Sequence, residues 1–256
     1  MSDWSSAQYL KFKAQRTQPA IDLAARIPSE EPREVIDIGC GPGNSTAVLR
    51  NRFPKAHIVG CDSSPDMIAA AKSAYPECDF MLAEVPSGLC GLEGRFDVVF
   101  SNACIQWIPH HDRLLPALMS LLKRGGVLAV QIPMNYDEPI HRIIGEIAES
   151  GEWREKLGCP RVFHTLSQSE YFDLLSEISS DFEIWQTTYC HRMPSHDSIM
   201  EWYKGTGLRP YIDALSEAEA EEFLRRVKAR VEQEYPVQKN GEIIFRFPRF
   251  FFLAEK

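Results

Sequence analysis

The sequence predicts an α/β fold, with a doubly wound, mostly parallel seven-stranded sheet, an antiparallel last strand and a helical cap. Short apolar segments alternate with helical patterns up to residue 133, which is typical of βαβ units around a parallel sheet. A turn with three glycines at alternate positions ends the first apolar segment. Beyond residue 137 the alternation stops, and two late segments rich in aromatic and β-branched residues predict strands that pair antiparallel and complete the sheet.

The first predicted strand leads directly into the glycine-rich turn. Before it, residues from about 5 to 27 predict one or two helices that end at Pro28. Residues 35–38 are a β-branched run, as expected of a strand buried in a parallel sheet. The glycines, beginning at Gly39, permit backbone angles closed to other residues and let a ligand approach the main chain. Residues 44–46, Asn-Ser-Thr, are of the N-cap type and predict a helix immediately afterwards.

Two acidic residues and the glycine spacing indicate which ligand this turn binds. The glycines do not follow the G-x-G-x-x-G pattern of dinucleotide sites, and no Lys-Ser/Thr pair of a phosphate-binding loop follows them. Asp37, inside the strand, is poorly placed for a phosphate but well placed for an ammonium group. Asp62 follows the next apolar strand, residues 57–61, about 20 residues on, where ribose hydroxyls are bound in related folds. An adenosine ligand with an ammonium tail and no phosphate fits this set.

With these residues the chain resembles the class I S-adenosylmethionine-dependent methyltransferases, whose first motif has the form D/E-x-G-x-G-x-G. The resemblance implies a Rossmann-like core with S-adenosylmethionine as cofactor. The cofactor-binding residues that follow from it are Asp37, Gly39, Gly41, Gly43, Asp62, Ser63, Met67, Glu84, Val85, Asn102 and Arg16. Glu84 would accept from the adenine amino group, although Asp is the commoner residue there. The alternative interpretation of the turn is an ordinary βα connection that binds nothing.

The remaining elements of the core continue the alternation. They are a helix beginning after the N-cap Ser64, strands over 78–83, 96–102 and 127–133, and a helix over 111–123. Ligands of open α/β sheets bind outside the carboxyl ends of the strands. Asn102 should therefore contact the amino-acid part of the cofactor, while Gln106 and Trp107 form a wall beside the transferring methyl group. Packing of Trp107 in the core is the alternative.

The second half of the chain predicts a helical cap inserted over the cofactor end of the sheet. Its elements are helical patterns over 137–180, a strand over 181–192, helices over 195–203 and 216–235, and a closing strand over 242–254 that bends at Pro248. Ser216 and Glu219 form a capping-box pattern at the start of the last helix. The predicted division is a core over 1–136, a cap over 137–240 that contributes one core strand, and a closing strand over 241–256.

Cations lie beside aromatic residues in three stretches of the cap, residues 189–196, 202–210 and 245–249. This combination suits a carboxylate with an apolar backbone, because arginine binds carboxylates bidentately. At these residues the resemblance narrows to family members that methylate small polycarboxylic acids, trans-aconitate above all. The implied substrate-binding residues are Trp107, Gln106, His191, Arg192, Tyr203, Arg209, Arg246 and Tyr9. The alternative for the three arginines is ion pairing with the chain's own acids, which is expected of at least one of them.

Composition limits the partners and the compartment. The 28 basic and 36 acidic residues give a net charge of −8, which argues against a nucleic-acid surface and makes long-range steering of an anionic substrate unfavourable. Seven scattered cysteines without a C-x-x-C pair predict reduced thiols in the cytoplasm. The chain shows no secretory signal and no apolar run of about 20 residues, so no membrane partner is expected. A monomer or a homodimer is expected.

The predicted reaction is transfer of a methyl group to a carboxylate. A carboxylic acid has a pKa of about 4, so near pH 7 it is already an anionic nucleophile and no general base or metal is expected. Two alternatives stay open: a methyltransferase for another small acid or an acyl-carrier substrate, and a regulator that binds S-adenosylmethionine without catalysis. Methylation of a nucleic-acid base is disfavoured, since residues 102–105, Asn-Ala-Cys-Ile, lack the Asn-Pro-Pro-Tyr-type signature.

Overall fold

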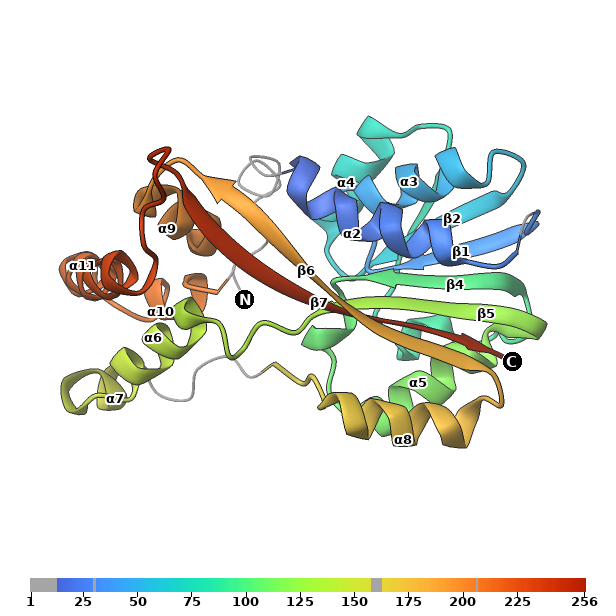
Figure 1. The fold of residues 1–256 in the computed structure, drawn as a ribbon. Coiled ribbons are helices and arrows are strands. Elements are labelled where there is room, and N and C mark those ends of the chain that lie inside the picture. The colour runs from blue at the N-terminus through green and yellow to red at the C-terminus, as the bar shows by residue number, and fades with distance from the viewer. Residues whose placement is uncertain (1–12, 30, 158–162, 206) are drawn as a thin grey trace. The chain divides into compact units, whose positions relative to one another are not determined.

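The computed structural model describes residues 13–29, 31–157, 163–205 and 207–256, and the side chains of residues 13–16 lie outside this description. The chain forms two compact units (Figure 1). Unit 1 contains the described residues up to 133 together with 163–187 and 249–256, and unit 2 contains those of 134–162 and 188–248. None of the described helices is long and apolar enough to cross a membrane.

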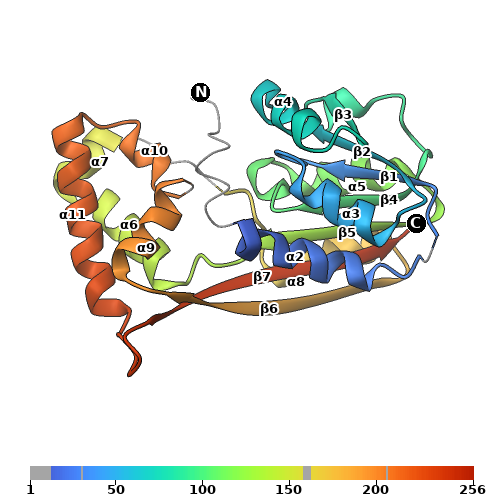
Figure 2. The same cartoon turned by 90° about the horizontal axis from the view of Figure 1, so that it is seen from above.

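The predicted seven-stranded sheet is confirmed. Its strands are β1 (Glu34–Ile38), β2 (His57–Asp62), β3 (Asp79–Leu82), β4 (Phe96–Asn102), β5 (Leu122–Pro133), β6 (Phe182–Met193) and β7 (Ile243–Glu255). They lie in the order β3-β2-β1-β4-β5-β7-β6. Neighbours from β3 to β5 pair in parallel, and β7 pairs antiparallel with β5. Figures 1 and 2 show β6 and β7 side by side, running in opposite directions.

Helices flank the sheet of unit 1. They are α2 (Lys13–Arg26), α3 (Asn44–Arg52), α4 (Pro65–Ala74), α5 (His111–Ser120) and α8 (Gln168–Ile178), with the short 3-10 helices η1 (Ser87–Leu89) and η2 (Ile105–Trp107). Figure 1 draws α2 and α3 to one side of the central strands and α5 and α8 to the other. The central strands β1, β4 and β5 are almost entirely buried, which explains their continuous apolar runs.

Unit 2 is mainly helical. Its helices are α6 (Pro139–Ala148), α7 (Gly151–Leu157), α9 (His196–Lys204), α10 (Arg209–Ile212) and α11 (Glu217–Glu234). The backbone N–H and the hydroxyl of Ser216 both donate to the Glu219 carboxylate, at 3.1 and 2.6 Å, so the two residues predicted to start α11 do interact. Ile140, Ile143 and Ile144 of α6 are buried, as the helical spacing of this segment predicts.

Two elements differ from the sequence prediction. The helix predicted over 111–123 ends at Ser120, and β5 begins at Leu122, because Leu122 pairs with Phe96 before an irregularity shifts the register. β7 continues through Pro248 without a break. Of the one or two helices predicted over about 5–27, α2 is the described part, and the part before residue 13 lies outside the described residues.

The compact units also divide the chain differently from the predicted core and cap. Helix α8, which the sequence placed in the cap region, belongs to unit 1. Its Tyr171 is fully buried, with its ring 5.5 Å from Phe250 and its hydroxyl 2.7 Å from His111 of α5. Since these contacts bury the apolar face of α8 against β7 and α5, this helix completes a layer of the core.

Candidate active site

The glycine turn after β1 leaves one open position. All three glycines have positive φ, at 70°, 55° and 90° for Gly39, Gly41 and Gly43. A Cβ on Gly39 would lie 2.2 Å from the sulfur of Cys104, and one on Gly43 would lie 2.6 Å from the ring of Tyr75. A Cβ on Gly41 would meet nothing within 4 Å. Packing therefore requires two of the glycines, and the backbone at Gly41 is accessible to a ligand.

Asp62 ties this turn to the next helix. One carboxylate oxygen accepts from the backbone N–H of Gly41 at 3.0 Å, and the other accepts from that of Ser64 at 2.9 Å. Ser64 is the N-cap of α4, as predicted, and its hydroxyl accepts from the backbone N–H of Met67 at 3.3 Å. Each oxygen of an ionised carboxylate can accept more than one hydrogen bond, so Asp62 keeps capacity for the hydroxyls of a ribose.

Asp37 is fully buried and partly satisfied. The hydroxyls of Ser45 and Thr46 both donate to its Oδ2 at 2.7 Å, so the prediction that these residues cap helix α3 is wrong; the N-cap is Gly43. Its Oδ1 is buried with no hydrogen-bond partner among the described residues. Burial, opposed by the two hydroxyls, raises the pKa of Asp37 to about 6. An ammonium group would supply both the missing donor and the opposite charge.

The end of β4 presents further acceptors. Asn102 Oδ1 and Gln106 Oε1 are buried and, within the described residues, make no hydrogen bond. Gln106 is held in η2 because its amide nitrogen donates to the carbonyl of Ala103 at 2.7 Å. The Trp107 ring is half-buried and lies 4.7 Å from the ring of Phe163, so it is not a fully buried core residue.

The strand register places four polar residues on one face of the sheet. Asp37 pairs with Phe100, two positions before Asn102, and Asn102 pairs with Gln131. Gln131 pairs with Phe251, two positions after Arg249. Side chains two apart on a strand share a face, so Asp37, Asn102, Gln131 and Arg249 all project from the same side.

The site prediction did not include Gln131 and Arg249. Gln131 is fully buried, Arg249 is 6% exposed, and Arg249 Nη1 lies 3.4 Å from Gln131 Oε1. The amide nitrogen of Gln131 is buried and has no hydrogen-bond partner in the described part of the chain. The available signal was a polar residue interrupting the apolar run 127–132 and a cation preceding the aromatic run 250–252.

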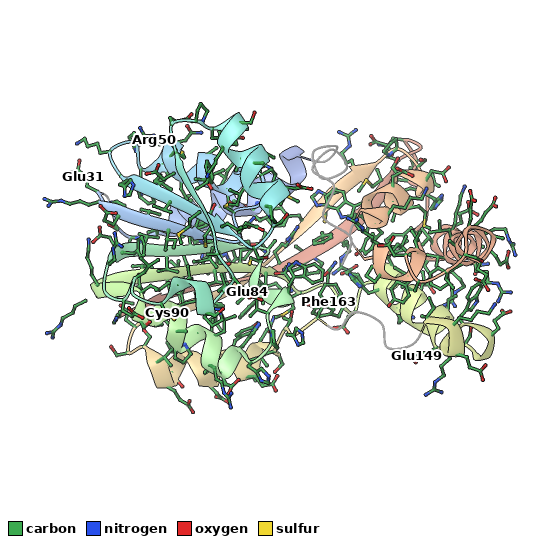
Figure 3. The ribbon with its side chains drawn as sticks, turned by 180° about the vertical axis from the view of Figure 1, so that it is seen from behind. Glu31, Arg50, Glu84, Cys90, Glu149 and Phe163 are labelled. Carbon is green, nitrogen blue, oxygen red and sulfur yellow. The ribbon has the colours of Figure 1, made fainter. Side chains whose placement is uncertain are left out.

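Two residues of the predicted adenine contact lie in the loop after β3. Glu84 is exposed, and its carbonyl accepts from the backbone N–H of Gly88 at 2.6 Å. The following bond, Val85–Pro86, is cis. Figure 3 shows Glu84 and Phe163 at one end of the sheet, with Glu31 and Arg50 at the other. Glu84 and Val85 are therefore at the end of the sheet that carries Asn102 and Gln106. Ser63 is exposed between β2 and α4.

The cations predicted to bind substrate are distributed within unit 2. Arg192 is exposed and makes a two-pronged ion pair with Glu242, at 2.8 and 2.9 Å, which is the alternative expected of at least one of the three arginines. The neighbouring His191 projects from the opposite side of β6 and lies 5.0 Å from the ring of Trp202. Arg246 is mostly exposed, with Nη2 3.7 Å from Glu138.

Tyr203 belongs to a buried polar group in unit 2. Its hydroxyl accepts from the side-chain amide of Asn135 at 3.1 Å, and its ring lies 5.2 Å from His141. Burial lowers the pKa of His141 to about 4, so this imidazole is neutral at pH 7. Arg209 Nε lies 3.5 Å from Asp213, one turn further along the chain. Tyr9 and the side chain of Arg16 lie outside the described residues.

Known proteins resemble this chain along its whole length. A family model described as "Methyltransferase domain" matches residues 35–126. A protein of Escherichia coli O139:H28 named trans-aconitate 2-methyltransferase is 45% identical over 256 residues, covering 100% of this chain and 99% of that protein. Proteins of the same name from Escherichia coli O7:K1 and Shigella flexneri are 46% and 45% identical with the same coverage.

Solved structures agree on the fold. The YcgJ protein from Bacillus subtilis has a TM-score of 0.62 at 14% identity, covering 93% of this chain and 98% of that chain. A Haemonchus contortus phosphoethanolamine N-methyltransferase, solved with phosphomonomethylethanolamine and S-adenosylhomocysteine, has a TM-score of 0.57 at 16% identity, covering 93% of this chain and 53% of that chain. At such identities the likeness supports the Rossmann-like architecture alone.

Proposed function

The chain belongs to the trans-aconitate 2-methyltransferase family of S-adenosylmethionine-dependent methyltransferases, and from this premise we propose that it converts one carboxylate of trans-aconitate into its methyl ester. The observation that carries the proposal is an identity of 45% that extends over all 256 residues. Similarity confined to the cofactor half would support only methyl transfer. Similarity that also covers residues 134–256 supports the same acceptor.

The residues of unit 1 suit the cofactor. The buried acceptors of Asp37 and Asn102 match an ammonium group, the Asp62 carboxylate matches a ribose, and the open backbone at Gly41 leaves room for the nucleoside. When bound, S-adenosylmethionine supplies a methyl group already activated on a sulfonium. Met67 is buried in the first turn of α4, on the segment that Asp62 holds. Ser63, Glu84 and Val85 stay predictions as contacts of the nucleoside.

The acceptor carboxylate requires alignment rather than deprotonation. Its pKa of about 4 leaves it ionised at pH 7, so the chain needs no general base. The contribution expected of the protein is to hold the acid and the methyl donor in register and to exclude water, and such positioning accounts for about 7–11 kcal/mol in favourable cases. Trp107 and Gln106 are proposed to form the wall of unit 1 that does this. The substrate contacts in unit 2 stay predictions: His191, Arg192, Tyr203, Arg209 and Arg246. The prediction for Arg192 is weaker than the others, because its guanidinium pairs with Glu242.

The test is methyl transfer from labelled S-adenosylmethionine to a panel of acceptors. The panel should contain trans-aconitate, citrate, a monocarboxylic acid and an acyl thioester. A base-labile labelled product formed fastest from trans-aconitate is expected. Faster methylation of the thioester than of trans-aconitate would identify a different acceptor. Binding of the cofactor without any methyl transfer would contradict the enzymatic function.

Asp62→Ala gives an independent test of the cofactor site. We expect S-adenosylhomocysteine to bind at least about tenfold more weakly, because a hydrogen bond to a charged group contributes about 1.5–3 kcal/mol. Asp79→Ala, at an exposed acid on β3, is the matched control and should bind normally. Unchanged affinity in Asp62→Ala would remove the basis of the assignment.

Compartment and assembly belong to the same proposal. The described cysteines at 40, 61, 78, 90, 104 and 190 are free thiols, which supports a reducing cytoplasm. We also propose that the protein is a monomer or homodimer that acts on a small molecule. The net charge of −8 favours the absence of a nucleic-acid partner.

A further inference from the structure

Arg249 is a buried cation in the same compact unit as the glycine turn. It lies on β7 opposite Pro133, at the end of β5 that follows Gln131. Parallel pairing of β5 with β4 makes this the carboxyl end, where ligands of open α/β sheets bind. Arg249 is buried, with 6% of the residue exposed, whereas the side chains of Arg192 and Arg246 are 77% and 61% exposed. Charge interactions at exposed positions are largely screened by water, and those at buried positions are much less so.

The shared face of the sheet is divided by hydrogen-bonding capacity. On β1 and β4 the buried atoms without a partner among the described residues are acceptors, Asp37 Oδ1 and Asn102 Oδ1. On β5 the buried atom without a partner among the described residues is a donor, the amide nitrogen of Gln131. β7 adds the donors of the Arg249 guanidinium, one of which lies 3.4 Å from Gln131 Oε1. Neighbouring strands lie about 4.8 Å apart, and groups of the two halves are one to three strand spacings from each other.

This division matches two ligands of opposite charge. Acceptors suit the ammonium group of the cofactor, and donors suit the carboxylates of the acid. Gln131 Oε1 accepts from Arg249 Nη1 at 3.4 Å and thereby orients the guanidinium. The amide nitrogen of Gln131 projects from the same face of the sheet. A carboxylate can accept from an amide and a guanidinium together, and a charge-assisted contact of this kind is about twice as strong as a neutral one.

We propose that Arg249, oriented by Gln131, binds a carboxylate of the substrate that is not methylated, and thereby selects polycarboxylic acids. The inference rests on the proposed function and adds a specificity-determining residue to it. An acid without a second carboxylate would forgo the charge-assisted contact, and a site built around buried polar groups discriminates strongly against such analogues.

The experiment compares Arg249→Met, Arg249→Lys and the near-isosteric Gln131→Glu. Gln131→Glu places an internal carboxylate beside the guanidinium, where it competes with the substrate. Titration calorimetry measures the binding of S-adenosylhomocysteine, and then of trans-aconitate to that complex, alongside kcat and KM. For each variant we expect acid affinity to fall about 10- to 100-fold, the loss being smallest for Arg249→Lys, while S-adenosylhomocysteine binds within about threefold of the parent.

The matched control is Arg225→Met, which removes an exposed arginine of α11 paired with Glu222 and should leave both affinities unchanged. Weakened binding of S-adenosylhomocysteine with normal acid binding would overturn the inference and assign Arg249 to the cofactor. Acid affinity within threefold of the parent in both Arg249→Met and Gln131→Glu would also overturn it. If the parent transfers no methyl group to trans-aconitate, the proposed function is wrong. Calorimetry measures the binding role of Arg249 separately from methyl transfer.

Discussion

At the scale of single residues, the burial of Asp37 decides how the cofactor site responds to pH. The carboxyl is enclosed, and two hydroxyls satisfy only one of its oxygens. Its pKa is raised to about 6, so ionisation is incomplete in mildly acidic solution. An arriving ammonium group favours the ionised form and must lower this pKa. Cofactor binding and proton release are therefore linked.

We expect the affinity for S-adenosylhomocysteine to rise with pH through about 6 and to level off above 7. Below the ligand-free pKa each pH unit costs up to about a factor of ten, so binding at pH 5 should be about tenfold weaker than at the plateau. Asp37→Asn should bind weakly at every pH and show no such slope. Calorimetry between pH 5 and 8 measures both curves. A slope that persists in Asp37→Asn would assign the titration to another group.

The glycines of the turn make distinguishable predictions. Gly39→Ala should lower the melting temperature strongly, because its Cβ would lie 2.2 Å from the sulfur and 2.4 Å from the Cβ of Cys104. Gly41→Ala should cost only the left-handed conformation, about 1–2 kcal/mol, yet weaken S-adenosylhomocysteine binding because the methyl fills the open side of the turn. Thermal melts and calorimetry check both.

A second substitution tests whether the contact with Cys104 is the cause. Cys104→Gly removes both atoms that the new methyl would meet, so combining it with Gly39→Ala should recover part of the lost stability. If the double variant melts no higher than Gly39→Ala, the backbone angle of Gly39 rather than the contact determines the loss.

At the scale of elements, the N-cap of α4 in unit 1 adjoins the proposed cofactor site, whereas the N-cap of α9 is part of unit 2. Ser64 caps α4 directly after Asp62, and Ser195 caps α9 in unit 2 with the same geometry, accepting from the backbone N–H of Ser198 at 3.3 Å. Ser64→Ala and Ser195→Ala should each lower the free energy of unfolding by about 1 kcal/mol.

Only Ser64→Ala should also weaken S-adenosylhomocysteine binding, because loosening the first turn of α4 releases the backbone that holds Asp62. Chemical denaturation gives the stabilities, and calorimetry gives the affinities. Equal effects of the two substitutions on binding would show that the cap of α4 is unimportant for the cofactor.

At the scale of the whole molecule, two compact units divide the proposed work. Unit 1 carries the acceptors and the carboxylate expected to bind S-adenosylmethionine, and unit 2 carries the buried group around Tyr203. The strands β6 and β7 belong to both units, because each unit takes part of their length. S-adenosylhomocysteine should therefore affect unit 1, and the response of each unit to the acid can be followed by itself.

Hydrogen–deuterium exchange tests this assignment. S-adenosylhomocysteine alone should slow exchange in residues 39–46 and 62–67 of unit 1. Adding trans-aconitate should slow exchange further in residues 129–133 of unit 1 and additionally in residues 135–141 and 203–209 of unit 2. Acetate at equal ionic strength, an acid without a second carboxylate, is the control for non-specific anion effects. Additional protection confined to residues 129–133 when both ligands are present would contradict the predicted substrate contacts of Tyr203 and Arg209.

The sequence by itself determined the order of the elements, the glycine turn with Asp37 and Asp62, and the antiparallel close of the sheet. These features depend on periodicity and on turn chemistry that act within a few residues. The cap of α4 was predictable for the same reason, since Ser64, Pro65 and Met67 lie within a single turn.

Only the tertiary structure decided which side chains meet. Strand order places β7 between β5 and β6, and this brings Arg249 beside Gln131, 118 residues earlier in the chain. Arg192 pairs with Glu242, 50 residues away in the chain, and the sequence offered such an ion pair only as an alternative. The hydroxyls predicted to cap α3 bind Asp37 instead, because Gly43 begins the helix and the buried carboxylate is the acceptor within their reach. A local pattern specifies where a strand or helix forms, whereas the neighbour that a buried polar group finds depends on how distant strands are stacked.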